Sequence, residues 1–580
     1  MKRSLAGAVV VAFAASALST GQIPIVNASD EGASETTAET EFVVVYDQSV
    51  SINDARAAIA AAGGTIVTEN AAVGVATIST TNGAFVADAS AQGAIEGVAR
   101  NQVIGEVPAA IHSDGAVIKS DDVATEGRGS TSSLVTRGKR APTAEPLADL
   151  QWDMQQIGAT PNGSYKYNQG SNKVLVGVID TGVDGTHPDI APNFNAALSR
   201  NFTTDIPFDA DGNVIDGPCE FAGCVDPANW DDDGHGTHVA STIASPINGI
   251  GIAGVAPKVQ IVNLRAGQDS GYFFLQPSVD ALTYAGDIGV DVVNMSYYVD
   301  PWLFNCTANP ADSPEAQAEQ SAIITAMQRA LDYARRHGVT LVSAAGNGAT
   351  DYTKPSVDGS SPDFASEPGE VAYPREIDPA ACTSMPSEGR GVISVSSTGI
   401  SKRKAYYSDY GNGYVDIAAP GGDAYDTPDG TLSYGGLVLA AYPAALAIAN
   451  GEVDENGVPT VPYVVEDCQN GVCAYYQYLQ GTSMASPHAV GVVALIISKY
   501  GHKDWAHGGL TMNPLLVEAT LRLTATKTPC PVPATYTYVR YRPADPTTPV
   551  VSTATCEGTL WNNGFYGSGI INALRVARGW

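Results

Sequence analysis

Four segments of the sequence contain residue types that could perform acid–base or nucleophilic chemistry. Asp180 directly follows the apolar stretch 174–179, and His235 lies between two glycines before an apolar helical stretch. Ser483 precedes a second apolar helical stretch, and Asn347 ends a third apolar segment. Each residue alone would be assigned a structural role, because aspartate, serine and asparagine are common helix caps and turn formers.

Together the four segments predict a catalytic site. Aspartate, histidine, serine is one of the chain orders found in catalytic triads. In a triad the serine hydroxyl attacks a carbonyl carbon, the histidine accepts its proton, and the aspartate orients the histidine ring. Unpaired N–H groups at a helix start can also stabilise an oxyanion. We therefore expect Ser483 to be the nucleophile and Asn347 a second oxyanion donor.

Two other kinds of site could use the same residue types. His235 and His238 are three residues apart, a spacing that could bind a metal on one helix face, but the glutamate of an HExxH motif is absent. The surroundings of Ser483 lack the Gly-x-Ser-x-Gly pattern of α/β-hydrolases. We therefore favour the triad.

From residue 152 onward, apolar strands alternate with helical stretches. Continuous Val/Ile runs with helices between them predict an α/β fold, in which helices cover both faces of a parallel sheet. Strand ends are where such sheets place reactive groups, in agreement with Asp180 and Asn347. The expected strands are 174–179, 259–263, 292–296, 339–345, 392–396 and 415–418, and a long helix is expected over 316–337.

The first residues have the pattern of an export signal. Residues 1–28 combine a basic start with a short apolar run, which predicts a signal peptide cleaved after Ala17 or Ala28, the second being preferred. Residues 29–41 are small and polar, as in a spacer. No later stretch is long and apolar enough for a membrane helix. We therefore expect a secreted, extracellular protein.

A small domain and a linker follow. Residues 42–112 predict the order β-α-β-β-α-β of a ferredoxin-like α+β unit, with the second helix over 82–99 and the last strand over 103–107. Residues 113–148 are rich in Ser, Thr, Gly, Asp and Pro, and predict a linker. The basic cluster at 137–140 in this linker is interpreted either as a processing site or as a solvated run.

The overall charge argues against two classes of partner. The 580 residues include 44% hydrophobic residues and 60 glycines, as in a globular protein, and the formal net charge is −30. Nucleic acid or an anionic membrane would be repelled by this charge. We therefore expect a hydrated monomer that binds neither nucleic acid nor membrane.

All eight cysteines lie after residue 200, which in an exported chain predicts disulfides. The close pairs Cys219/Cys224 and Cys468/Cys473 predict local loop clips. Zinc is a poor alternative because no CxxC pattern or nearby histidine accompanies them. The pairing of the other four stays open: Cys306, Cys382, Cys530 and Cys556.

The four segments resemble the signatures of the subtilase family of serine peptidases. The matching residues are 180–182, 235–238, 344–347 and 481–487, with further similarity at 294–296 and 416–421. The resemblance covers about residues 150–580 and implies a subtilisin-like peptidase domain over 149–580, with a three-layer parallel sheet. It also implies that 42–112 is an inhibitory propeptide that assists folding and is removed by self-cleavage between about 112 and 148.

The resemblance also implies where substrate binds. Extended substrate is expected to pair with strands that flank the cleft, and the site residues implied are Ser270, Gly271, Ser296, Tyr297, Tyr298, Ala345 and Gly346. The family usually has Ser-Leu-Gly where this sequence has Ser296-Tyr297-Tyr298, which leaves the preference for the residue before the scissile bond open. The long segment 421–481 could border the cleft or decorate the surface, and we favour decoration.

Catalysis in this family needs no cofactor, but calcium is expected as a structural ion. Asp189, Asn248, Ile250 and Ile252 match positions of a calcium site that subtilisins commonly have. The stretch 209–213 has the alternating oxygen spacing of a calcium loop, but lacks the glutamate at the twelfth position.

These observations predict a secreted serine endopeptidase that is made as a self-inhibited zymogen and hydrolyses polypeptides. A specialised processing protease is the first alternative, because Tyr297 and Tyr298 depart from the family pattern. A catalytically silent secreted binding protein is the second, since a fold does not fix a function. The complete set Asp180, His235, Ser483 and Asn347 argues against the second alternative.

Overall fold

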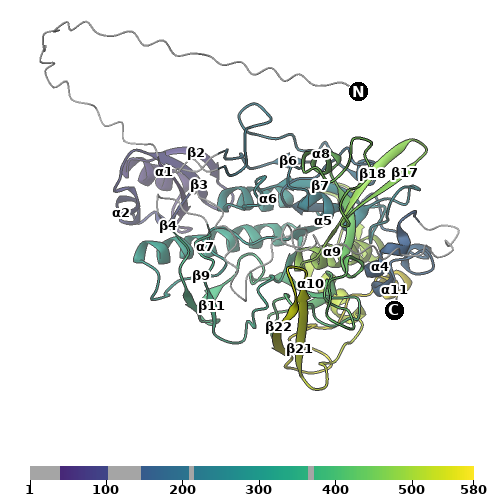
Figure 1. The fold of residues 1–580 in the computed structure, drawn as a ribbon. Coiled ribbons are helices and arrows are strands. Elements are labelled where there is room, and N and C mark those ends of the chain that lie inside the picture. Colours follow the sequence, from purple (N-terminus) through teal and green to yellow (C-terminus); the bar gives the residue numbers. More distant parts are fainter. Residues whose placement is uncertain (1–39, 102–144, 208–213, 364–370, 580) are drawn as a thin grey trace, which may run out of the picture. The chain divides into compact units, whose positions relative to one another are not determined.

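A computed structural model describes residues 40–101, 145–207, 214–363 and 371–579 of the chain (Figure 1). The described residues contain a small antiparallel sheet near the N-terminal end and a larger parallel sheet that positions the candidate site. Residues 1–39, 102–144, 208–213 and 364–370, which include the predicted signal peptide, most of the linker and the 209–213 loop, lie outside the described part.

The small sheet has the predicted element order, with two corrected boundaries. Its strands are arranged β2-β3-β1-β4. The second helix is shorter than predicted and a strand follows it over Ile95–Arg100, because Gly93 lies in a turn and Ile95 and Val98 are buried in the sheet. The strand predicted over 103–107 lies outside the described residues. The elements are β1 (Thr40–Tyr46), α1 (Ile52–Ala61), β2 (Thr65–Asn70), β3 (Val75–Thr80), α2 (Phe85–Ser90) and β4 (Ile95–Arg100).

The central sheet is parallel, as the apolar runs predict. Its strand order is β15-β14-β10-β8-β5-β7-β6, and all six predicted strands are present with ends shifted by a few residues. The strands are β5 (Leu175–Ile179), β6 (Arg200–Asn201), β7 (Gln260–Arg265), β8 (Val292–Met295), β10 (Thr340–Ala344), β14 (Val392–Thr398) and β15 (Ile417–Pro420).

Helices cover both faces of the central sheet. On one face, α5 (His235–Ala244) and α9 (Thr482–Tyr500) belong to a single large apolar core. On the other face, α6 (Leu275–Asp287) and α7 (Pro314–Arg336) pack against each other and on the sheet (Figure 1). The helix predicted over 316–337 is therefore confirmed as α7.

The small sheet packs against α6 and α7. Val43 and Val45 on β1 and Ala99 on β4 share an apolar core with Ala322 and Ile323 of α7. The fit is close, because a side chain at Gly97 would come within 2.9 Å of the Ala322 methyl carbon. The outer face of the small sheet has a separate core with α1 and α2.

Four disulfides join all eight cysteines. Cys219–Cys224 and Cys468–Cys473 are the local clips expected from their spacing. The two pairs that the sequence left open are Cys306–Cys382 and Cys530–Cys556. Cys306–Cys382 joins the short strands β9 (Asn305–Cys306) and β13 (Cys382–Thr383), which also pair in the backbone.

The favoured interpretation of 421–481 as surface decoration is wrong. This segment forms a three-stranded sheet of β16 (Val438–Tyr442), β18 (Val472–Leu479) and β17 (Val464–Gln469). β16 is completely buried and packs on α5, where the Ala441 N–H donates to the Ser241 hydroxyl at 3.0 Å. Most of β18 from Ala474 onward is buried too, although this part of the strand contains three tyrosines.

Candidate active site

Asp180 lies immediately after β5, at the carboxyl end of the central sheet. Its side chain is completely buried, and the Oδ1 atom accepts hydrogen bonds from the Thr181 N–H at 2.9 Å and from His235. The Asp180 carbonyl also accepts from the backbone N–H groups of Ala266 and Gly267, just after β7. These bonds hold the carboxylate in one orientation.

His235 begins α5 and lies beside this carboxylate. Its Nδ1 is 2.7 Å from Asp180 Oδ1, which leaves Nε2 for the cleft. The close approach depends on Gly236, since a side chain there would come within 2.0 Å of the Gly182 carbonyl oxygen. Gly236 thus permits the close approach of α5 to the turn after β5.

The charge of Asp180 controls the basicity of His235. Burial lowers the pKa of His235, but the Coulombic attraction and hydrogen bond of Asp180 outweigh burial and raise this pKa to about 9. Asp233 and Asp231 add to the same effect. The site therefore stabilises an imidazolium, which is the species that forms when His235 takes a proton from a nucleophile.

Ser483 lies in the first turn of α9. Its hydroxyl donates to the Ser296 carbonyl at 3.4 Å, and no hydrogen bond joins it to His235 among the described residues. Side-chain bonds fix the first turn, because Ser486 donates to Asn294 at 2.7 Å and the Ser296 hydroxyl donates to the Ser483 carbonyl at 3.1 Å. Catalytic hydrogen bonds are often long without substrate and shorten when it binds.

Asn347 follows β10 and faces the same cleft. Its Oδ1 accepts from both the N–H and the hydroxyl of Thr482, each at 2.9 Å. Because the amide oxygen is occupied in this way, the Nδ2 donor is directed away from Thr482, and Asn347 lines the cleft beside Ser483. The Ser483 N–H has no hydrogen-bond partner within the described part of the chain. The two donors predicted for an oxyanion are thus available.

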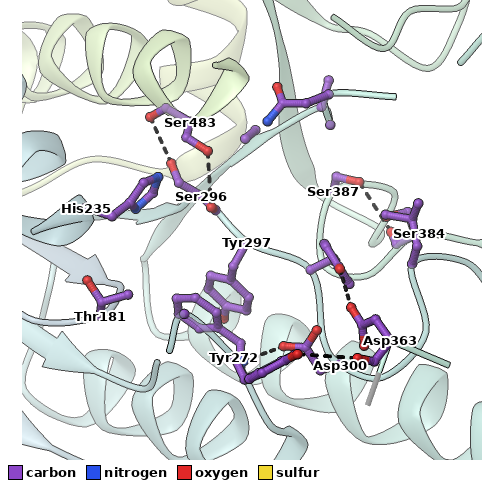
Figure 2. A pocket seen from close by; sticks show the side chains of 18 of the residues that line it. Thr181, His235, Tyr272, Ser296, Tyr297, Asp300, Asp363, Ser384, Ser387 and Ser483 are labelled. Carbon is purple, nitrogen blue, oxygen red and sulfur yellow. Dashed lines mark hydrogen bonds between the residues drawn. The ribbon is translucent and has the colours of Figure 1, made fainter. Parts of the chain in front are cut away.

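The predicted substrate residues line one cleft of about 200 Å³. Ser483 and His235 lie at one end of it, and Asp300 and Asp363 lie at the other (Figure 2). Tyr297 stacks face to face on Phe273 at a centroid distance of 4.2 Å. The structure brings together every predicted lining residue: Ser270, Gly271, Ser296, Tyr297, Tyr298, Ala345 and Gly346.

A match to a known family agrees with this geometry. The model of the subtilase family matches residues 171–545, more than half of the chain. The chain belongs to the subtilase family. This subtilase therefore has the subtilisin-like α/β fold of a family of serine peptidases.

The sequence relatives of this subtilase are distant. It is 29% identical over 371 residues to fervidolysin from Fervidobacterium pennivorans, an alignment that covers 62% of this chain and 40% of fervidolysin. It is 28% identical over 332 residues to subtilisin DY from Bacillus licheniformis, covering 57% of this chain and 79% of subtilisin DY. The match thus spans less than half of fervidolysin's own length.

Solved structures share the fold of this subtilase. The crystal structure of the epidermin leader peptide processing serine protease EpiP from Staphylococcus aureus has a TM-score of 0.59 at 20% identity, covering 93% of this chain and 98% of that chain. The crystal structure of fervidolysin has a TM-score of 0.53 at 22% identity, covering 95% of this chain and 62% of that chain.

His238 is a buried structural residue of this subtilase. Its Nε2 lies 3.2 Å from the Val438 carbonyl oxygen and 3.1 Å from that of Gln477. Burial lowers its pKa to about 3, so the ring is neutral near pH 7. His238 faces β16 and β18 whereas His235 contacts Asp180, which argues against a shared zinc ion.

The residues expected to bind calcium lie together. Asp189 Oδ2 accepts from the Ile252 N–H at 3.0 Å, and the Asn248 amide lies beside Asp189. Asp189 Oδ1 is buried and accepts no hydrogen bond from the described residues. Burial raises the Asp189 pKa to about 7. A hard cation would satisfy this oxygen, so the residues fit calcium.

The loop 248–252 also has contacts that the sequence did not predict. Ile250 donates its N–H to Asn248 Oδ1 at 3.1 Å, and Gly249 donates to Glu145 Oε2 at 2.7 Å. Glu145 therefore brings a second carboxylate to the loop from the end of the predicted linker. No local motif marks Glu145, because it is remote in sequence from Asp189 and Asn248.

Sequence reasoning missed several lining residues of the cleft. Tyr272 and Phe273 directly follow the predicted pair Ser270 and Gly271, so their proximity in sequence was an available signal. The acidic residues at the far end had no such signal, because loops outside the family motifs carry them. The other missed residues are Thr181, Asp233, Asp300, Leu303, Ala344, Tyr352, Asp363, Ser384, Ser387, Gln480 and Met484.

Proposed function

We propose that this subtilase is a secreted endopeptidase that hydrolyses peptide bonds through Asp180, His235 and Ser483, with an oxyanion hole made by Asn347 and the Ser483 N–H. One observation carries the proposal: these groups, from four distant segments, meet at one end of a single cleft. The cleft is lined by the residues expected to bind extended substrate. A catalytically silent protein would have no need to keep all four groups.

The chemistry follows from the positions of the groups. Ser483 Oγ forms a bond to the substrate carbonyl carbon while His235 Nε2 takes the hydroxyl proton. The resulting oxyanion accepts hydrogen bonds from Asn347 Nδ2 and the Ser483 N–H. His235 then gives the proton to the leaving amine as the carbon–nitrogen bond breaks. The acyl group of the substrate now remains bonded to Ser483 Oγ. Water attacks this acyl group by the same steps, which releases the carboxylic acid product and restores the Ser483 hydroxyl.

The small N-terminal sheet supports synthesis as a zymogen. Polar contacts join it to the peptidase helices: Arg329 donates to the Tyr46 carbonyl at 2.8 Å, and Asn70 donates to Asp280 at 2.7 Å. Such a surface can template the packing of α6 and α7 during folding. We assign residues 42–112 as propeptide, 113–148 as the linker that is cut, and 149–580 as the peptidase domain.

Calcium and export complete the proposal. Asp189, Asn248 and Glu145, with the loop that carries Ile250 and Ile252, would hold calcium as a structural ion, while catalysis needs no cofactor. The formal net charge of −30 and the signal-like residues 1–28 favour secretion as a monomer. Among the described residues, no helix is long and apolar enough to cross a membrane.

Hydrolysis of casein by the full-length secreted chain tests the proposal. We expect Ser483→Ala to lower turnover by about 10⁴-fold or more, whereas Ser498→Ala, on the same helix but outside the cleft, should leave it unchanged. N-terminal sequencing should show loss of 42–112 in the wild type and its retention in Ser483→Ala. Equal casein hydrolysis by Ser483→Ala would overturn the assignment of the nucleophile.

A further inference from the structure

The end of the cleft opposite Ser483 is acidic. Asp300 and Asp363 line it (Figure 2). Asp233, whose Oδ1 accepts the His235 N–H at 3.0 Å, also lines the cleft. Among the described residues that line the cleft there is no lysine or arginine. With three carboxylates and His235 as the only basic side chain, the lining attracts cations.

Hydrogen bonds hold both far carboxylates in position. Asp300 Oδ2 accepts the Phe273 N–H at 2.5 Å, and the Tyr298 hydroxyl donates to Asp363 Oδ2. Tyr272 donates its hydroxyl to the Asp363 carbonyl at 3.3 Å. The unusual Tyr298 therefore orients an acidic side chain, where the family usually has a glycine.

The pKa values of the two tyrosines next to these carboxylates indicate a negative electrostatic potential. Burial raises the pKa of Tyr272, and the charges of Asp363 and Asp300 raise it further. The same causes raise the pKa of Tyr298 well above its usual value. A charge that disfavours a phenolate at this end of the cleft favours a cation there.

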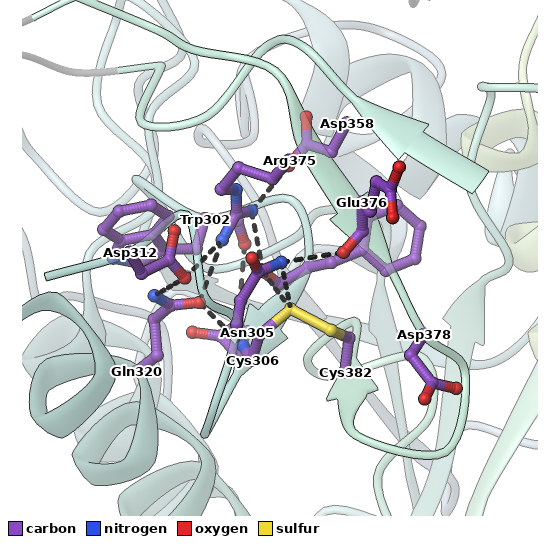
Figure 3. Close-up of a disulfide and its surroundings, with 12 residues drawn as sticks. Trp302, Asn305, Cys306, Asp312, Gln320, Asp358, Arg375, Glu376, Asp378 and Cys382 are labelled. Atoms are coloured by element: carbon purple, nitrogen blue, oxygen red, sulfur yellow. Dashed lines mark hydrogen bonds and ion pairs between the residues drawn. A yellow bond between two sulfur atoms is a disulfide. The ribbon is translucent and has the colours of Figure 1, made fainter. Parts of the chain in front are cut away.

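A disulfide and a buried ion-pair cluster lie in the loops that follow this acidic end of the cleft, and Figure 3 shows the cluster. The disulfide Cys306–Cys382 joins the two loops that bear Asp300 and Ser384. Arg375, completely buried, pairs with Asp358 at 2.6 Å and Asp312 at 3.2 Å and lies over the Trp302 ring. Because its charge is balanced by these two partners, Arg375 does not cancel the charge of this acidic end.

We propose that the far end of the cleft binds the arginine or lysine side chain of the substrate residue that precedes the scissile bond, with Asp300 and Asp363 as the specificity-determining residues. The oxyanion donors fix the scissile carbonyl, and the segments 296–298 and 344–346 leave a path from it to these carboxylates. An apolar side chain would desolvate the carboxylates without pairing them. This inference rests on the proposed function and narrows it towards a processing protease.

The sequence of the chain contains a matching substrate. Arg137, Lys139 and Arg140 form the basic cluster in the linker before the peptidase domain. A preference for basic residues makes the bond between Arg140 and Ala141 a site for self-cleavage. N-terminal sequencing of the secreted wild type should then yield a form that begins at Ala141, and Ser483→Ala should lack it.

The direct test measures kcat/KM for four peptides Ala-Ala-Pro-X p-nitroanilide, with X as Arg, Lys, Phe or Leu. We expect the basic peptides to exceed Phe and Leu by about 100-fold. Asp300→Asn and Asp363→Asn should each lower kcat/KM for Arg by about 10- to 100-fold and change the value for Phe less than about threefold. Glu455→Gln removes an exposed charge in the loop before β17 and should change neither value.

Different outcomes distinguish this inference from the proposed function. Higher kcat/KM for Phe or Leu in the wild type would overturn the inference and leave the endopeptidase intact. An equal loss for all four peptides in both variants would assign the two aspartates a structural role and would also overturn it. Failure of the wild type on every peptide and on casein would overturn the proposed function itself. The wild-type comparison needs no variant, so a folding defect cannot remove the test.

Discussion

At the residue scale, the His235–Asp180 pair sets the pH at which the enzyme works. His235 acts as a base only when it is neutral, and its pKa of about 9 keeps most of the ring protonated at pH 7. The rate constant kcat/KM should therefore increase with pH up to about pH 9. A pH–rate profile with a peptide nitroanilide measures this rising limb of kcat/KM. A midpoint of the rise at pH 6.5 or below would contradict the account.

Asp180→Asn is the matched variant for that profile. Removal of the carboxylate charge should move the rising limb to lower pH, because less attraction favours the imidazolium. Turnover should decrease by about 10⁴-fold, since the ring loses its orienting partner. An unchanged limb in Asp180→Asn would mean that another group titrates in the profile.

Single residues also show what the sequence could reveal. Asp180, His235, Ser483 and Asn347 were predictable because each ends a strand or begins a helix, and their order has a chemical meaning. Asp300 and Asp363 were not, because they lie on loops whose positions depend on Arg375 and the pairing of Cys306 with Cys382. Neither contact leaves a local pattern in the sequence.

At the element scale, the two disulfides Cys306–Cys382 and Cys468–Cys473 should contribute unequally to stability. The first spans a sequence separation of 76 residues and the second only 5. Chain-entropy arguments give about 4.5 kcal/mol for the longer loop and about 2 kcal/mol for the shorter one. Urea unfolding of the Ser483→Ala background, with each pair changed to serine, measures the two losses. Equal losses would contradict the expectation.

Elements were predictable where their apolar pattern was continuous. The strands of the central sheet and α7 are in the expected places because buried Val/Ile runs and a long amphipathic period are strong signals. α2 and β4 were misjudged because alanine and glycine around Gly93 fit a helix or a strand equally well. β16 and β18 were missed as core elements, since their burial depends on α5, which is distant in sequence.

At the scale of the whole molecule, calcium should stabilise the folded chain. The ion would neutralise the carboxylates of Asp189 and Glu145. Without it, burial and the charge of Glu145 disfavour the ionised form of Asp189. In the Ser483→Ala background, millimolar calcium should raise the melting temperature by about 3 °C or more relative to EGTA. Asp189→Asn should lose most of this increase, and Asp454→Asn, in an exposed turn, should keep it.

An equal melting temperature in calcium and EGTA would show that the loop at Asn248 is held by its hydrogen bonds alone. Magnesium should not replace calcium, because it demands a tighter octahedral geometry. The small domain has apolar strands and helices that the sequence indicates, whereas the predicted spacer and linker lie almost entirely outside the described residues, so the domain boundaries stay a prediction. The packing of the small sheet on α6 and α7 was not predicted, because no local pattern in either segment marks it.

Covalent labelling tests the central claim most directly. A serine-directed phosphonate is added to the correctly processed wild type, and the modified peptide is identified by mass spectrometry. The account predicts one adduct on Ser483, formed much more slowly in Asp180→Asn and absent in Ser483→Ala. An adduct on another residue, or no adduct in correctly folded and processed protein, would contradict it.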